Sequence, residues 1–151
     1  MVNRVRAFRI IKRVLYLSGL LTEELSDIYP KNPPKFGVKT ERLIVSKMLY
    51  LDPGLTINKL AKEIGTNRTY LSKFFSGEKG CKFRDYINML RAEHAKSLLL
   101  TIKRYAIADI AILSGFGSVR ALNRAFRKNF GKLPSQLRKE LLRADSEPPL
   151  Q

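Results

Sequence analysis

The sequence has little cysteine and histidine, and each scarcity excludes a class of site. Cys81 is the one cysteine among 151 residues, which excludes an intrachain disulfide framework and a zinc site built from several cysteines. His94 is the one histidine, so most metal-binding and acid/base constellations are excluded as well. The sequence also shows no Gly-rich phosphate loop, paired carboxylates or Ser-His-Asp set. We therefore expect a protein that is not an enzyme and that uses no cofactor and no metal.

Long apolar runs are missing too. The longest uncharged apolar stretch near the N-terminus, Val14–Leu21, is far shorter than the ~20 residues that cross a bilayer. Thr22, Glu23 and Glu24 follow it, where a secretory signal would carry small residues at a cleavage site. We expect a cytoplasmic protein in a reducing compartment, where Cys81 stays a thiol.

Acidic residues are scarce relative to basic ones. Asp and Glu number 13 against 29 Lys and Arg, which gives a formal net charge of +16. Such an excess favours a polyanionic partner but says little about the fold. The apolar share of 44% is enough for a real core, which excludes a disordered basic tail.

Residues 4–17 predict an amphipathic helix. An apolar face lies opposite a basic one, the first made by Ala7, Phe8, Ile10, Ile11, Val14 and Leu15 and the second by Arg6, Arg9, Lys12 and Arg13. Such a helix is suited to an acidic membrane surface, to a partner helix or sensor domain, or to this protein's own core. Packing and pairing are favoured over the membrane, and the sequence does not separate those two.

The remaining chain predicts an all-α fold. Pro30–Pro34 is a stiff connector that ends an N-terminal helical segment, residues 1–38. A helical domain is expected over residues 39–142 and a flexible tail over 143–151, because the final stretch has no periodicity. Apolar residues in the domain recur at helical spacing, without an alternating strand pattern.

Turn and cap residues divide this domain into helices. Ile44, Met48 and Leu51 predict one helix that Asp52-Pro53-Gly54 stops. Further helices are expected from the cap Thr56 to Gly65, from Asn67 and Arg68 to Gly77–Gly80, over residues 82–100 and 106–113, from the cap Ser118 to Gly131, and from Pro134 onward.

One unit of two helices occurs twice. Leu60-Ala61 and Gly65, followed by Tyr70-Leu71 and Phe75, return as Ile110-Ala111 and Gly115, followed by Ala121-Leu122 and Phe126, at an offset of 50 and then 51 residues. The small alanine lets two helices cross closely, and the glycine permits the tight turn between them. The leucine and phenylalanine attach the second helix to the core. The pattern predicts two helix-turn-helix units in tandem.

These residues resemble the DNA-binding domain of AraC/XylS-type bacterial transcription regulators over about residues 40–142. The shared motif continues through Ser72-Lys73-Phe74, Gly80, Phe83, Tyr86, Arg91, Ala95 and Leu98-Leu99 in the first half, and through Phe116-Gly117-Ser118, Asn123–Lys128 and Gly131–Arg138 in the second. Leu122, Leu133 and Leu137 depart from the usual aromatic, threonine and tyrosine. The resemblance implies two helix-turn-helix subdomains joined by a long linker helix. It also implies a sequence-specific regulator of transcription, an activator that binds double-stranded DNA and recruits RNA polymerase.

Two outward helix faces are the candidate DNA readers. Leu71, Phe74 and Phe75 point inward in one helix, and the second is expected to bury Leu122, Ala125 and Phe126. The opposite faces match the family's base-contacting positions and carry Arg68, Thr69, Ser72, Lys73, Arg120, Asn123 and Arg124. Arg suits guanine and Asn suits adenine in the major groove, so the second helix should discriminate more. Phosphate contacts are expected from Ser76, Lys79, Lys82, Arg104, Ser118, Arg127, Lys128 and Lys132.

The linker predicts the spacing of the two readers. About nineteen helical residues extend roughly 28 Å, and adjacent major-groove segments on one DNA face repeat at about 34 Å. One monomer is therefore expected to insert its two recognition helices into successive major grooves, and similar proteins often bend the duplex to do so.

Two alternatives stay open at this point. The charge alone also permits a protein that binds nucleic acid without sequence specificity, although the two recognition helices argue against it. Regulators of this family normally carry a separate sensory domain, and the roughly forty residues before the matched region are too few for the usual barrel. A stand-alone module and the output fragment of a larger, membrane-tethered sensor, which would be membrane-proximal, both fit. The sequence does not set the oligomeric state.

Overall fold

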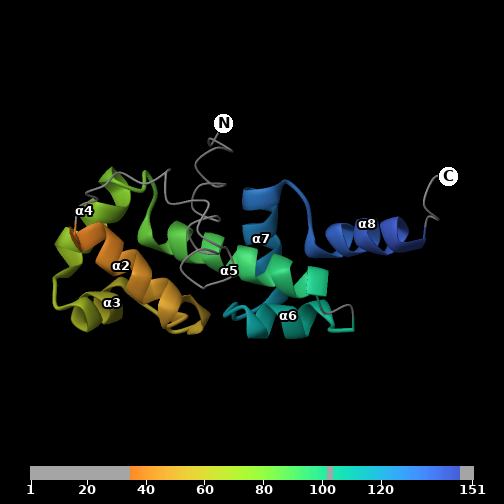
Figure 1. The fold of residues 1–151 in the computed structure, drawn as a ribbon, viewed down its shortest axis with the longest axis horizontal. Coiled ribbons are helices and arrows are strands. Elements are labelled where there is room, and N and C mark those ends of the chain that lie inside the picture. Colours follow the sequence, from red (N-terminus) through yellow and green to blue (C-terminus); the bar gives the residue numbers. More distant parts are fainter. Residues whose placement is uncertain (1–34, 102–103, 147–151) are drawn as a thin grey trace. The chain divides into compact units, whose positions relative to one another are not determined.

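The computed structural model describes residues 35–101 and 104–146 (Figure 1). The described residues form helices and no strand, which confirms the all-α prediction. They belong to two compact units that meet in the sequence at Phe83 and Arg84. The amphipathic segment 4–17 and the apolar stretch Val14–Leu21 lie outside the described residues. None of the helices described is both long and apolar enough to span a membrane.

In the first unit, the described residues 35–83 contain three α-helices and one 3-10 turn. They are α2 (Lys35–Ser46), the 3-10 turn η2 (Leu49–Leu51), α3 (Ile57–Ile64) and α4 (Arg68–Gly77). Helices α3 and α4 pack against each other and form the first helix-turn-helix. The buried apolar side chains are Ile44, Val45, Tyr50, Leu60, Ala61, Leu71, Phe74 and Phe75. Each of these elements therefore buries apolar side chains, and the inward face predicted for α4 is confirmed.

The end of α2 differs from its prediction. The expected helix continued through Met48 and Leu51, but α2 ends at Ser46 and Met48 has a left-handed φ of 48°. The Met48 amide donates to the carbonyl of Val45 at 3.0 Å, a tightened bond that terminates the helix. The chain then turns so that Tyr50 is buried, while Met48 is 51% exposed. Burial of the larger aromatic side chain is the physical reason why the helical spacing of Met48 was misleading.

In the second unit, the described residues contain the long helix from its second residue onward and three shorter helices. They are α5 (Phe83–Thr101), α6 (Ile107–Leu113), α7 (Val119–Phe130) and α8 (Pro134–Ser146). Pro134 opens α8, as expected, because proline is favoured in the first turn. Helix α2 starts before residue 39 and α8 continues past residue 143, so both cross the limits expected for the helical domain. The division into domains itself stays a prediction.

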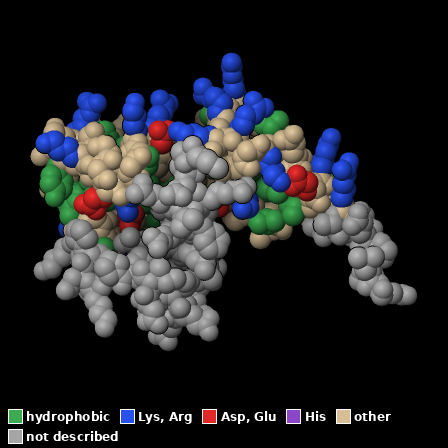
Figure 2. All heavy atoms as spheres, turned by 90° about the horizontal axis from the view of Figure 1, so that it is seen from above, with side chains coloured by type: hydrophobic (Ala, Val, Ile, Leu, Met, Phe, Trp, Pro, Cys, Tyr) green, Lys and Arg blue, Asp and Glu red, His purple; other side chains and the backbone are tan. Residues whose placement is uncertain are grey.

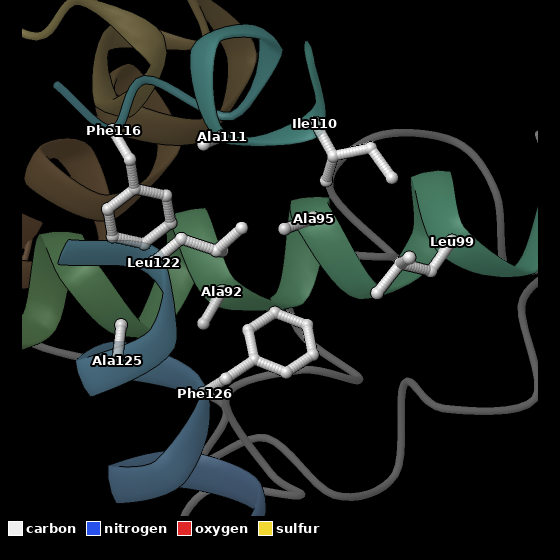
Figure 3. Packing of buried hydrophobic residues seen from close by; sticks show 9 residues of the cluster. All are labelled: Ala92, Ala95, Leu99, Ile110, Ala111, Phe116, Leu122, Ala125 and Phe126. Carbon is white, nitrogen blue, oxygen red and sulfur yellow. The ribbon is translucent and has the colours of Figure 1, made fainter. Parts of the chain in front are cut away.

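Side chains of α5, α6 and α7 form the core of the second unit (Figure 3). Leu122 and Phe126 of α7 and Phe116 of the turn belong to one buried cluster with Ala92 and Ala95 of α5. The alanines leave room for these large side chains because they carry only a methyl group. Truncating a buried phenylalanine to alanine typically costs about 3–5 kcal/mol of stability. The orientation of α7 is therefore fixed by its buried face.

Candidate nucleic-acid interface

The turns of the two helix-turn-helix units are built alike. Gly65 ends α3 with a φ of 77°, and Gly115 follows α6 with a φ of 76°, a left-handed conformation that glycine adopts without steric cost. The next residue closes the turn in each unit: the amides of Thr66 and Phe116 donate to the carbonyls of Ala61 and Ala111, both at 2.9 Å. These bonds satisfy carbonyls that a helix end would otherwise leave unpaired. The repeat seen in the sequence is thus a repeat of backbone geometry.

The second helix of each unit starts at a side-chain cap. The Oδ1 atom of Asn67 accepts a hydrogen bond from the amide of Tyr70 at 2.8 Å, which starts α4. The Oγ atom of Ser118 accepts from the amide of Ala121 at 3.2 Å, which starts α7. Such a cap typically contributes about 1 kcal/mol. Since the Ser118 hydroxyl acts only as acceptor in this bond, its hydrogen is still able to donate to a DNA phosphate.

The predicted base-reading residues lie on the outer faces of α4 and α7. Leu71 and Leu122 are fully buried on the opposite faces. Asn123 is half-buried, and the exposed members of the set are Arg68, Thr69, Ser72, Lys73, Arg120 and Arg124. Among the described residues, none forms an ion pair with Arg68, Lys73, Arg120 or Arg124. The structure brings each group of readers together on its helix, and their contact with bases stays a prediction.

Helix α7 is the more basic of the two readers. Its sequence carries Arg120, Arg124, Arg127 and Lys128 and no acidic residue. Figure 2 shows Lys and Arg side chains projecting from the surface of both units, with few acidic side chains in view. The positive end of a helix dipole also lies at each N-terminus, where it favours nearby phosphate. The charge of these helices therefore suits a polyanion.

The expected phosphate contacts differ in their surroundings. Lys82, Arg104 and Arg127 are exposed. The ammonium groups of Lys128 and Lys132 lie 2.7 and 2.5 Å from carboxylates of Asp85 and Glu140. Exposed ion pairs typically contribute only about 0–1 kcal/mol, so a phosphate is able to replace these carboxylates. The Ser76 hydroxyl donates to the carbonyls of Ser72 and Lys73, at 2.9 and 3.2 Å, so its hydrogen is already used within α4.

Lys79 is held inside the first unit. Its side chain is 14% exposed and pairs with the carboxylate of Glu41, which is almost completely buried. The ammonium also lies 5.6 Å from the ring centroid of Phe74, within cation–π range. This geometry disfavours Lys79 as a phosphate contact. The sequence analysis did not predict this ion pair. The feature that could have indicated it is Glu41, an acidic residue one helical turn before the buried residues Ile44 and Val45.

His94 and Cys81 belong to neither of the two reading faces. His94 is half-buried on α5, and burial lowers the pKa of its imidazole from the ordinary value of 6.5. It is therefore a boundary residue between the buried and the exposed side of α5. Cys81 is half-buried after α4, and its amide donates to the carbonyl of Phe75 at 3.1 Å.

Comparison with known proteins agrees with this geometry. A family model described as a helix-turn-helix domain matches residues 60–140, which include both turns. The Msm operon regulatory protein of Streptococcus mutans is 34% identical over 99 residues, or 64% of this chain. The regulatory protein SoxS of Escherichia coli is 34% identical over 92 residues, or 61% of this chain. The C-terminal domain of the response regulator AraT from Geobacillus stearothermophilus superposes with a TM-score of 0.64 at 25% identity, covering 74% of this chain and 88% of that one.

The matched region makes up different shares of these relatives. It spans 35% of the length of the Msm operon regulatory protein and 85% of SoxS. Duplicated turns, duplicated caps and two outward basic faces occur here on the same residues that the family model covers. The chain belongs to the AraC/XylS-type helix-turn-helix family and carries the DNA-binding domain of a transcription regulator.

Proposed function

We propose that this protein binds a specific double-stranded DNA sequence by placing α4 and α7 in the major groove. The outer face of α7 carries the proposal. Arg120 and Arg124 are exposed on it and form no ion pair within the described part of the chain, while buried Leu122 and Phe126 fix the helix from behind. Arginine pairs with the O6 and N7 atoms of guanine, and the neighbouring Asn123 suits adenine.

Helix α4 would read the other half of the site. Its outer face offers the hydroxyls of Thr69 and Ser72 and the ammonium of Lys73, with Arg68 at the flank. Hydroxyls hydrogen-bond several bases and discriminate less than arginine does. We therefore expect α7 to contribute more of the specificity. Helix α5 has 19 residues, or roughly 28 Å at 1.5 Å per residue, which supports the proposal that one monomer occupies successive major grooves.

The substitution Arg124→Ala tests base readout. We expect it to lower affinity for a selected duplex by about 1–3 kcal/mol and to relax preference at one base pair. Lys132→Ala is the matched control, because loss of a phosphate contact weakens all duplexes similarly. Binding of both variants to the selected and to a random duplex at fixed salt checks this. An equal loss on both duplexes for Arg124→Ala would contradict the readout role and favour binding without sequence specificity.

We further propose that the bound protein activates transcription by contacting RNA polymerase in the cytoplasm and is not itself an enzyme. The family relationship supports this, since the relatives compared above are named regulators. Transcription in vitro from a template that carries the selected sequence next to a weak promoter tests it. Added protein should raise the transcript yield on this template and leave a template with a scrambled sequence unchanged; no rise, or the same rise on both, contradicts activation.

A further inference from the structure

Helix α2 packs on the first reading helix from outside the region that the family model matches. That region begins at residue 60, whereas α2 covers Lys35–Ser46. The ring of Phe36 meets the ring of Tyr70 edge to face, with centroids 4.6 Å apart and an interplanar angle of 84°. It meets Phe74 in the same way at 5.7 Å. Tyr70 lies in the first turn of α4, so Phe36 contacts α4 next to Thr69, one of the predicted base-reading residues.

The backbone of α2 also touches α4 directly. Gly37 has no side chain, and a Cβ atom there would lie 2.9 Å from Cε2 of Phe74 and 3.0 Å from Oε2 of Glu78. The Glu78 side chain is able to move, but the Phe74 ring is buried and held by its neighbours. The distance between the two helices is therefore set by the absence of a side chain at Gly37.

A buried ion pair attaches α2 at the other end of α4. Glu41, one helical turn after Gly37, pairs with Lys79, which follows α4 in the chain. Separation of the two segments would break this buried ion pair, which is energetically unfavourable. Helix α4 is thus held by α2 near its first turn through Phe36 and beyond its last turn through Glu41.

We propose that Phe36 and Gly37 are positioning residues for DNA readout: they set the angle at which α4 presents Thr69, Ser72 and Lys73 to the bases. Tyr70, which Phe36 contacts, is adjacent to Thr69 in the chain and 51% exposed, so its ring is held by the contact with Phe36 and not by full burial. Base-reading side chains must be held within about 0.5 Å of their productive position. The inference rests on the proposed function and adds that specificity in the first half-site is set from outside the helix-turn-helix.

The experiment compares base-by-base profiles of the full chain. Each base pair of the selected duplex is changed in turn, and affinity is measured for Lys73→Ala and Arg124→Ala to identify the base pairs read by α4 and α7. Phe36→Ala should reduce discrimination at least threefold at the α4 base pairs and leave the α7 base pairs unchanged. Phe36→Tyr, which keeps the ring, should restore the profile. Ser46→Ala, an exposed and uncharged change in the same helix, should have no effect.

Each outcome decides the matter. Thermal unfolding and titration of the active fraction establish that every variant is folded; if Phe36→Ala does not fold, Phe36→Leu, which keeps apolar volume without a ring, takes its place. A uniform loss over all base pairs, or an unchanged profile, overturns the positioning role while the proposed function stands. If Lys73→Ala and Arg124→Ala themselves lack localised effects, the proposed function fails and the inference fails with it.

Discussion

Individual basic side chains differ in the ion pairs that they form, although each contributes one charge to the net charge of +16. Arg120 and Arg124 form no ion pair within the described residues, whereas Lys128 and Lys132 form exposed pairs. Lys79 forms a buried one. Exposed pairs contribute about 0–1 kcal/mol, while breaking a buried pair typically costs about 3–5 kcal/mol. We therefore expect bases to engage Arg120 and Arg124 and phosphates to compete for Lys128 and Lys132, whereas Lys79 stays with Glu41.

His94 predicts how the stability of the protein depends on pH. Burial lowers the pKa of His94 below its ordinary value of 6.5, because desolvation disfavours the imidazolium. The unfolded chain thus binds more protons below that pH, and the free energy of unfolding should fall as the pH decreases from 6.5 through the folded pKa. Since this is the one histidine of the sequence, its ring resonances report the folded pKa in an NMR titration without assignment.

The variant His94→Gln provides the control for that titration. It should lose stability less steeply between pH 7 and 5 than the unmodified protein does. Burial raises the pKa of the neighbouring Glu93, an effect of opposite sign, so the difference between the two proteins isolates the histidine. A titration midpoint at or above 6.5 would show that His94 is not desolvated.

Helices were predictable from the sequence where local chemistry defines them. Thr56, Asn67 and Ser118 lie at the starts of α3, α4 and α7, and their side chains accept the capping bonds. The end of α2 was not predictable, because the buried position of Tyr50 overrides the local helical spacing of Met48. The buried and the exposed faces of α4 and α7 were both predictable, because apolar residues at helical spacing define one face and leave the other to polar residues. The pairing of Glu41 with Lys79 was not predictable, since it joins separate elements.

The contact between α2 and α4 gives a prediction at the scale of elements. Gly37→Ala should destabilise the first unit by about 1 kcal/mol, because overlap with Phe74, worth about 1–3 kcal/mol, exceeds the gain in helix propensity. Gly77→Ala is the matched control: it also lies in a helix, but a Cβ there meets no atom within 4 Å. This variant should be neutral or more stable by up to about 1 kcal/mol. Chemical denaturation of both proteins measures the difference, and equal effects would contradict the close approach of the two helices.

For the molecule as a whole, the charge predicts a strong dependence of DNA binding on salt. With about 6–10 phosphates neutralised, the logarithm of the binding constant should fall with the logarithm of salt concentration with a slope of about −5 to −9. Lys82→Gln should make this slope shallower by about 0.9, since one phosphate contact is lost. Lys79→Gln should leave the slope of the folded fraction unchanged, because Lys79 is already paired with Glu41. A shallower slope for Lys79→Gln would show that this lysine reaches the DNA after all.

The most direct measurement is selection of bound duplexes from a random pool, followed by footprinting of the purified protein on the enriched sequence. Two recognition helices in successive major grooves predict two blocks of preferred base pairs about one helical turn apart, within one protected window of about twenty base pairs. The block assigned to α7 should be the more stringent, since α7 presents the two arginines. Enrichment of no sequence, or protection without a discrete window, would contradict the account.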